Sequence, residues 1–205
     1  MGFYNQYILP RLVHSVCRHK QFSDQRRKIV PLARGRVLEV GIGSGLNLPF
    51  YDPDKVSHVW GLDPSESMQD MAEKRAQSSE FSFAFLNAPG KAIPLEKNDA
   101  DTILITYTLC TIAEVEKSFD EMRRVLKQGG KLLFCEHGRS PDPRIRSCQN
   151  RLNPFWRFVS GGCNLNRNIP GIIEGSGFKI DHIESMYIPG FKIAGFNYWG
   201  AALQR

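Results

Sequence analysis

The sequence predicts an α/β protein built on a doubly wound, largely parallel β-sheet. Short apolar segments alternate with segments of helical periodicity through the middle of the chain, which is the order that a parallel sheet requires. One of the apolar segments runs directly into the glycine-rich stretch Gly41-x-Gly43-x-Gly45. Near the C-terminus the alternation stops, and two strand-like segments follow each other without a helix between them. The length of 205 residues is that of a single globular domain.

Five central strands are predicted from short runs of apolar and β-branched residues. The run at 102–107 is almost entirely apolar, as expected of a strand that is buried on both faces. The run at 81–86 instead alternates between apolar and small or polar residues. The five predicted strands are residues 36–40, 56–62, 81–86, 102–107 and 131–136.

Two helices are predicted between these strands. Ser65 is positioned to cap a helix that continues through Ala76 and carries Met68, Met71 and Ala72 on one face. The second helix spans 114–126, and Gly129-Gly130 is expected to stop it.

The last two predicted strands, 178–183 and 197–203, are joined by a segment with Ile188-Pro189-Gly190 and no helical pattern. Such a connection is too short for a parallel crossover, so we expect the two strands to pair antiparallel at one edge of the sheet. The remaining segments, 3–19, 23–33 and 139–176, are expected to form a helical cap beyond the carboxyl ends of the strands, where open α/β sheets bind ligands. The single domain therefore divides into an N-terminal cap (1–34), a core (35–137), a cap insertion (138–176) and a C-terminal strand pair (177–205).

Positive charge is concentrated in two segments of the chain. The formal net charge is +6, with +7 in residues 1–36 and +4 in residues 139–157, so the rest of the chain is net acidic. This distribution is compatible with an anionic substrate, a membrane surface or nucleic acid, and equally with a solvated face that keeps the protein in solution.

The five cysteines are odd in number, irregularly spaced and without a C-x-x-C pair, so neither a disulfide framework nor a zinc site is predicted. Cys110 and Cys163 are interpreted as small buried apolar residues. Cys135-x-His137 offers only two ligands, so no metal is expected there. No stretch approaches eighteen apolar residues and no secretory leader is evident, which favours a cytoplasmic protein that is at most peripheral to a membrane.

The glycine-rich stretch and Asp63 together predict a nucleotide site. The glycines supply a tight turn, close backbone approach and the start of a helix with free N–H groups. Asp63 ends the second strand, where a carboxylate can accept hydrogen bonds from a ribose diol. A dinucleotide fingerprint would have its last glycine at the position of Leu46, so the pattern favours an adenosine ligand without a pyrophosphate. Glu39 is a further carboxylate that either faces an ammonium group of the ligand or meets solvent.

Three motifs in order resemble those of class I S-adenosylmethionine-dependent methyltransferases. Residues 37–45 (VLEVGIGSG) resemble the first motif, Gly61-Leu62-Asp63-Pro64-Ser65-x-x-Met68 resembles the second, and residues 123–132 (RRVLKQGGKL) resemble the stretch before the fifth strand. The resemblance implies a Rossmann-like seven-stranded sheet of order 3-2-1-4-5-7-6 with strand 7 antiparallel. It also implies S-adenosylmethionine as the cofactor and S-adenosylhomocysteine as the product.

The resemblance also implies roles for individual residues. Gly41, Gly43 and Gly45 would line the methionine and ribose of the cofactor, and Asp63 would hold the ribose hydroxyls. Asn87-Ala88 matches the place where the family reads the adenine edge, although the following residues depart from the family pattern, so that Gly90-Lys91 is an alternative. The complete cofactor-binding set is Glu39, Gly41, Gly43, Gly45, Asn47, Asp63, Pro64, Met68, Asn87, Ala88, Thr106 and Leu109.

The acceptor side is predicted from local matches and from aromatic residues. Short matches at residues 107–112, 135–137 and 162–165 are most similar to the thiol S-methyltransferase group, with phospholipid N-methyltransferases and quinone C-methyltransferases as near relatives. His137 is the candidate general base, with a structural histidine as the alternative, because histidine titrates near neutral pH. Aromatic residues of the two basic segments, together with one at the end of the fourth strand, are expected to line a pocket for a small lipophilic acceptor. Ordinary core packing, a lid over the cofactor and an interfacial anchor are the alternatives. These substrate residues are Tyr4, Tyr7, Tyr107, Phe155 and Trp156.

Two alternatives of a different kind remain open at this point. One is a protein that binds the adenosyl cofactor without turning it over, and the other is a nicotinamide oxidoreductase. Base-modifying enzymes of the superfamily that the chain resembles carry an Asn/Asp-Pro-Pro-Tyr/Phe motif at the position of residues 106–108. That motif is absent here, so methylation of a nucleic-acid base is not favoured, although the charge stays compatible with RNA. Peripheral membrane contact through the basic N-terminal segment is compatible with the sequence, and so are both a monomer and a dimer.

Overall fold

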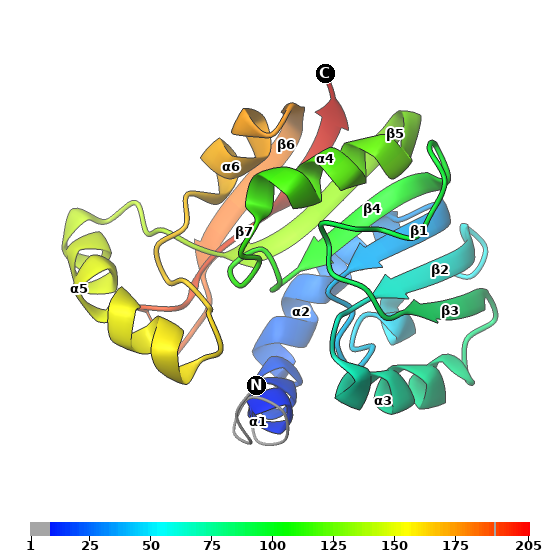
Figure 1. Cartoon of the computed structure of the whole chain (residues 1–205). Coiled ribbons are helices and arrows are strands. Elements are labelled where there is room, and N and C mark those ends of the chain that lie inside the picture. The colour runs from blue at the N-terminus through cyan, green and yellow to red at the C-terminus, as the bar shows by residue number, and fades with distance from the viewer. Residues whose placement is uncertain (1–8, 191) are drawn as a thin grey trace.

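The computed structural model describes residues 9–190 and 192–205, with side chains from residue 12 onward, and its core is one seven-stranded sheet (Figure 1). The strand order is β3-β2-β1-β4-β5-β7-β6. β1 to β5 are parallel, whereas β7 is antiparallel to both β5 and β6. The predicted fold class and strand order are confirmed. The strands are β1 (Gly35–Val40), β2 (Val56–Leu62), β3 (Ser82–Leu86), β4 (Ala100–Thr106), β5 (Leu126–His137), β6 (Phe178–Tyr187) and β7 (Phe196–Gln204).

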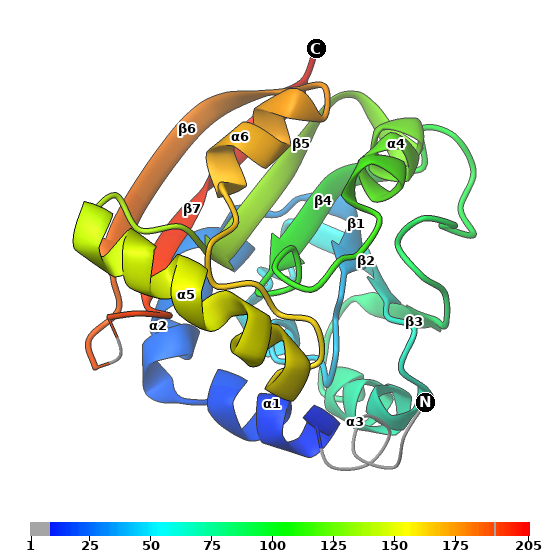
Figure 2. The ribbon, with the colours of Figure 1, turned by 60° about the vertical axis from the view of Figure 1, so that its left-hand side comes forward.

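Helices cover both faces of the sheet and its carboxyl end. α4 and α6 lie over one face, α2 lies behind the other, and α1 and α5 lie beyond the strand ends (Figures 1 and 2). No helix in the described part of the chain is long and apolar enough to cross a membrane. The helices are α1 (Leu9–Cys17), α2 (Lys20–Ile29), α3 (Glu66–Ala76), α4 (Val115–Val125), α5 (Pro143–Val159) and α6 (Ile169–Gly175), with short 3-10 turns η2 (Val30–Leu32) and η3 (Leu48–Phe50).

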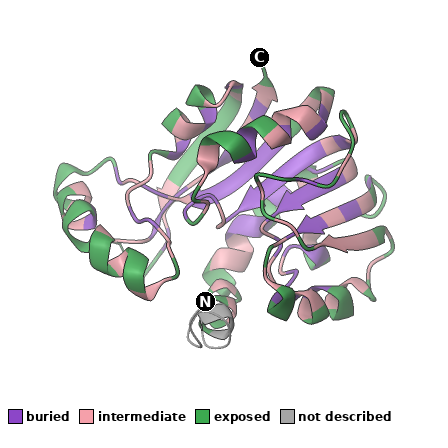
Figure 3. Cartoon of the chain, viewed as in Figure 1, coloured by how far each residue is buried: buried purple, intermediate pink, exposed green. Residues whose placement is uncertain are grey.

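Two apolar layers hold the helices onto the sheet. On one side Phe119 of α4 packs with Phe178 of β6, their ring centroids 5.8 Å apart. On the other side Ile29 and Val30 pack against the opposite face of β1 and β2. The strands at the centre of the sheet are consequently buried, while β6 is exposed along much of its length (Figure 3). This rigid centre fixes the carboxyl ends of β1, β2, β4 and β5, where the site lies.

Three local features differ from the sequence-based expectations. α6 is not part of the cap, because Ile169 and Ile173 are fully buried against the sheet. α4 ends at Val125, before the two glycines, because Leu126 is already extended and pairs with Ala100 at the start of β5. Ser65 occupies the N-cap position of α3, but its hydroxyl makes no capping hydrogen bond.

The glycine-rich stretch is also not the start of an α-helix. Residues 41–47 form successive turns, and the crossover from β1 to β2 contains only the 3-10 turn η3. Gly41, Gly43 and Gly45 all have positive φ, which right-handed helices do not allow, and Pro49 follows closely. The crossover therefore presents turn N–H groups to the site instead of a helix end.

Candidate functional site

The carboxylate of Asp63 anchors the glycine loop (residues 41–47) through a backbone hydrogen bond. Gly43 donates its N–H to Oδ2 of Asp63 at 3.0 Å, and Ser65 donates its N–H to Oδ1 at 2.9 Å. Burial raises the pKa of Asp63, and these two donors oppose that effect. A Cβ at Gly43 would meet nothing within 4 Å, so the backbone of the loop borders open space at this point. A ligand can therefore approach the main chain at Gly43 directly.

Gly45 has a different function from the first two glycines. A Cβ at this position would lie 3.2 Å from the Cα of Ala72 in α3, and the positive φ of 74° adds strain for any side chain. Gly45 therefore allows α3 to pack closely against the glycine loop, and the sequence did not predict this close contact. It does not line the cavities described next.

A cavity of about 580 Å³ extends from the glycine loop across the ends of β2 and β4. Of the predicted cofactor residues, Gly41, Gly43, Asp63, Pro64, Met68 and Ala88 line it. Tyr107, predicted on the acceptor side, lines it as well, and so do Gly90 and Lys91. Asn87 is exposed and is not part of the lining, so the structure brings Ala88 and the Gly90-Lys91 backbone to the cavity but not the Asn87 side chain. Leu109 is fully buried in the core and does not line it either.

A second cavity of about 80 Å³ lies at the end of β1 and shares Gly41, Gly43 and Met68 with the first. Glu39 lines it and is 1% exposed, so the alternative in which this carboxylate meets solvent is wrong. Its Oε1 accepts from Nδ2 of Asn47 at 2.8 Å and its Oε2 from the Tyr51 hydroxyl at 2.7 Å. Nδ2 of Asn47 also donates to Oγ1 of Thr106 at 2.8 Å. Burial raises the pKa of Glu39 to about 7, although both donors counteract it.

The two basic segments meet over these cavities. Val13 of α1 lines both, and Nδ1 of His14 lies 2.6 Å from Oγ of Ser44 in the glycine loop. Ser160 and Gly161, which follow α5, line the larger cavity. The predicted cap position of α1 and α5 is thus observed. Tyr4 and Tyr7 lie outside the described residues.

The aromatic residues of α5 are arranged differently from the predicted pocket. Phe155 is 69% exposed and Phe158 is 84% exposed, so neither lines an interior pocket. Trp156 is half-buried on the opposite side of the helix and hydrogen-bonds through its side chain to Cys163. Of the two predicted substrate residues in α5, the structure brings only Trp156 toward the site.

Comparisons with known proteins match this geometry to one family. A family model described as a methyltransferase domain matches residues 38–134, a segment that begins within β1, ends within β5 and contains the glycine loop and Asp63. The thiol S-methyltransferase TMT1B of Rattus norvegicus is 33% identical over 155 residues, which are 72% of this chain and 62% of the relative. The chain belongs to the class I S-adenosylmethionine-dependent methyltransferases.

Other members of the family show how broad the likeness is. The demethylmenaquinone methyltransferase of Clavibacter sepedonicus is 29% identical over 120 residues, which are 58% of this chain and 48% of the relative. A Thermotoga maritima structure, titled as a possible histamine N-methyltransferase, has a TM-score of 0.66 at 18% identity and covers 98% and 100% of the two chains. The latter likeness concerns the fold alone. The aligned segment spans less than two thirds of the rat relative.

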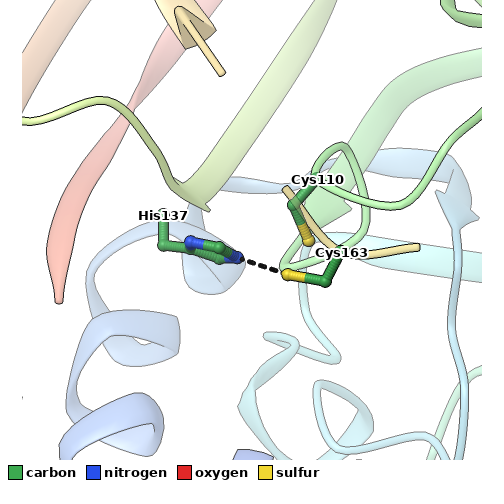
Figure 4. Close-up of side chains that lie close together, drawn as sticks. All are labelled: Cys110, His137 and Cys163. Carbon is green, nitrogen blue, oxygen red and sulfur yellow. Dashed lines mark hydrogen bonds between the residues drawn. The ribbon is translucent and has the colours of Figure 1, made fainter. Parts of the chain in front are cut away.

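Close to residues that line the larger cavity, the fold brings together three side chains that the sequence does not group. Cys110 follows β4, His137 ends β5 and Cys163 lies in the loop after α5 (Figure 4). Sγ of Cys163 lies 3.2 Å from Nε2 of His137. The Cys110 thiol, then the His137 ring and the Trp156 indole, lower the pKa of Cys163 against the effect of burial. Burial acts to lower the pKa of His137, but the contact with Cys163 outweighs it and the pKa is raised.

The interpretation of Cys163 as a buried apolar residue is therefore wrong. Its sulfur is half-buried and in polar contact, whereas Cys110 is buried as expected. Cys135 lies apart from the other two: its Sγ contacts the Tyr107 hydroxyl and Nδ2 of Asn197. Twenty-five or more residues separate the three members of the cluster along the chain, so spacing alone could not reveal it.

Glu136 lies directly before His137 in β5, next to the cluster. It is fully buried, and its Oε1 accepts the N–H groups of Thr108 and Leu109 at 2.7 and 2.9 Å. Its Oε2 is buried without a hydrogen-bond partner among the described residues. Leu109, predicted to bind the cofactor, thus acts through its backbone N–H on the strand-end carboxylate.

Proposed function

We propose that the protein transfers the methyl group of S-adenosylmethionine to the sulfur of a small lipophilic thiol. The proposal rests on one observation: the larger cavity extends from Gly43 and Asp63 to Thr111 and Gly161, the segments that carry Cys110 and Cys163. The proposed cofactor site and the segments that carry the two cysteines therefore border the same space. The likeness to a thiol S-methyltransferase supports a thiol as the acceptor.

The residues around the cavities fit this cofactor. The Asp63 carboxylate is placed for the ribose hydroxyls, and Gly43 leaves the loop backbone accessible. Pro64, Met68 and Ala88 provide apolar surface for the adenine ring. Glu39 in the smaller cavity is placed to attract the ammonium group of the methionine end. In contrast, Gly45, Asn87 and Leu109 line neither cavity.

S-adenosylmethionine supplies a methyl group on a sulfonium that a nucleophile displaces in line. The protein's own task is then to orient the acceptor and to receive its proton, since a thiolate is a far better nucleophile than a thiol. We propose His137, held by Cys163, as the side chain that takes part in this step. Tyr107 and Trp156 would border the acceptor.

The test follows a labelled methyl group from S-adenosylmethionine into three parallel acceptor pools: short alkyl thiols, vesicles of amino-phospholipid, and quinols. We expect the label in a thioether. Label in lipid would instead identify an amine N-methyltransferase, and label in quinol a C-methyltransferase. S-adenosylhomocysteine binding without transfer to any pool would identify a cofactor-binding protein that is not an enzyme for these acceptors.

Cofactor affinity is expected to rise with pH through the titration of Glu39. With its pKa at about 7, the carboxyl is mostly neutral at pH 6 and mostly ionised at pH 8, and only the ionised form attracts an ammonium group. The Kd for S-adenosylhomocysteine, measured by calorimetry, should therefore decrease by about tenfold over this range. Glu39→Gln should bind more weakly with a flat pH profile, whereas the exposed control Glu66→Gln should behave as wild type. A flat profile in the wild type would contradict the placement of Glu39.

We also propose that the cap contacts an anionic membrane surface, where a lipophilic acceptor would be concentrated. Leu12, Val13 and Val16 of α1 and Leu152, Phe155 and Phe158 of α5 are exposed, and exposed arginines accompany them in α5. Apolar and basic residues together are typical of interfacial helices.

Replacing two aromatic residues of this surface should weaken membrane binding. Removing two inserted rings costs about 1.5–3 kcal/mol each, so Phe155→Ser/Phe158→Ser should reduce the vesicle-bound fraction at least about tenfold. The measurement is sedimentation with vesicles that contain phosphatidylserine. Leu32→Ser is the matched control, because Leu32 is 56% exposed at the opposite end of the sheet. Equal sedimentation of the double variant and wild type would contradict the proposal.

A further inference from the structure

Three donor atoms of the kind that bind thiophilic metals converge beside the larger cavity. Sγ of Cys110, a ring nitrogen of His137 and Sγ of Cys163 all lie within 4.8 Å of one another. They come from three different segments, and the close-up shows both sulfurs and the imidazole directed toward a common point (Figure 4). A zinc ion lies about 2.3 Å from sulfur and about 2.0–2.1 Å from nitrogen, so small side-chain movements would bring these donor atoms around a single ion.

The composition of this cluster is that of a catalytic zinc site. Structural zinc sites are closed by four protein ligands, whereas catalytic sites have three, two cysteines and one histidine being one known set, and leave the fourth position to water or substrate. In the described part of the chain no fourth cysteine, histidine or carboxylate joins the group. Soft thiolate ligands also select zinc over magnesium or calcium.

A buried carboxylate and a guanidinium lie close to the cluster. Glu136 is fully buried next to His137, and its Oε2 has no hydrogen-bond partner among the described residues. A buried carboxylate oxygen without a partner is costly unless positive charge lies nearby. The neighbouring cation Arg167 already donates to the carbonyl oxygens of Leu109 and Ile112.

The segments that carry two of the proposed ligands also border the space assigned to the acceptor. Thr108 and Thr111, on either side of Cys110, line the larger cavity, and so do Ser160 and Gly161, which precede Cys163. Cys110, His137 and Cys163 do not line the cavity themselves, so an ion held by the cluster would lie directly behind these lining residues. A ligand in the cavity could complete its coordination.

We propose that Cys110, His137 and Cys163 bind one zinc ion and that its fourth position takes the sulfur of the thiol acceptor. The second half of this inference rests on the proposed function. The acceptor R–SH loses its proton to solvent as its sulfur binds the ion. The bound thiolate then displaces the methyl group, so that a carbon–sulfur bond to the acceptor forms, the methyl–sulfonium bond breaks, and S-adenosylhomocysteine leaves with the bond's electron pair. With the ion in place, His137 is a ligand rather than the proton acceptor, and the metal supplies the acidity of the thiol.

The first experiment measures metal binding without S-adenosylmethionine. The full chain, stripped of metal, is titrated with Zn²⁺ and separately with Co²⁺ under reducing conditions. We expect one equivalent of either ion and, for cobalt, the sulfur-to-metal charge-transfer band and the intense visible bands of tetrahedral coordination. Cys163→Ser and His137→Gln should lose the binding, while Cys148→Ser, which removes a cysteine outside the cluster, should retain it.

Thermal unfolding of each metal-free variant shows whether it is folded. Absence of binding by the wild-type protein, or equal binding by folded Cys163→Ser and His137→Gln, would overturn the metal site. The second experiment adds a short alkyl thiol to the cobalt-loaded protein. Growth of the charge-transfer band would support coordination of the acceptor, and an unchanged band would overturn that half. Both readouts are independent of methyl transfer, so failure of the proposed function leaves the metal result intact, and the reverse also holds.

Discussion

Asp63→Ala is expected to weaken S-adenosylhomocysteine binding by at least about 100-fold. Hydrogen bonds to an ionised group contribute about 1.5–3 kcal/mol each, and the proposed site has two such bonds between Asp63 and the ribose diol. The same substitution also removes the acceptor of the Gly43 and Ser65 N–H groups, so the glycine loop loses its anchor. Calorimetry with the purified variant measures the loss.

Two controls accompany Asp63→Ala. Asp70→Ala removes an exposed carboxylate of α3 and should leave the Kd unchanged. Asp63→Asn retains an oxygen acceptor for the Gly43 N–H but lacks the charge, so an intermediate affinity is expected. A Kd for Asp63→Ala within threefold of wild type would show that the ribose is not bound at the end of β2.

His137→Ala is expected to reduce kcat for thiol methylation by about 100-fold or more, the typical contribution of a positioned group in proton transfer or of a metal ligand. His137 is connected to the site through Cys163, whereas the cofactor residues lie on β1, β2 and the glycine loop. The Kd for S-adenosylhomocysteine should therefore remain within about twofold of wild type. Steady-state kinetics with the thiol pool, together with calorimetry, separates the two effects.

A structural histidine predicts a different result. Loss of packing alone would lower the melting temperature and leave kcat of the remaining folded protein nearly unchanged. Cys148→Ser is the control for loss of a cysteine outside the cluster and should retain full activity. Unchanged kcat in folded His137→Ala would remove His137 from the proposed mechanism.

The sheet was predictable because its central strands are chemically distinctive. Residues 102–107 are nearly all apolar, and β4 is indeed buried along almost its whole length. The short connection at Pro189-Gly190 excluded a helical crossover, and β6 and β7 pair antiparallel. Asp63 was also identifiable from the sequence, because a single crossover connects the glycine-rich stretch to β2 and Asp63 directly follows that strand.

The features that the sequence did not reveal depend on contacts between distant segments. The triad of Cys110, His137 and Cys163 exists only because β4, β5 and the loop after α5 end at one place. α6 was assigned to the cap because its seven residues are too few for a clear helical period, and burial of Ile169 and Ile173 places it on the sheet. The crossover after β1 contains turns and no α-helix because Gly41, Gly43 and Gly45 have positive φ. The spacing of these glycines in the sequence does not reveal that conformation.

The position of α1 has a kinetic consequence. Val13, His14 and Cys17 form part of the wall of the smaller cavity, so the methionine end of a cofactor in that cavity would lie against this helix. Two hydrogen bonds hold α1 there in addition to apolar packing. One joins His14 and Ser44, and in the other the Arg26 guanidinium donates to the Cys17 carbonyl oxygen. Two such hydrogen bonds contribute about 0.5–1.5 kcal/mol each, weak enough for repeated opening. Opening of α1 would then speed the departure of S-adenosylhomocysteine without changing the methyl-transfer step itself.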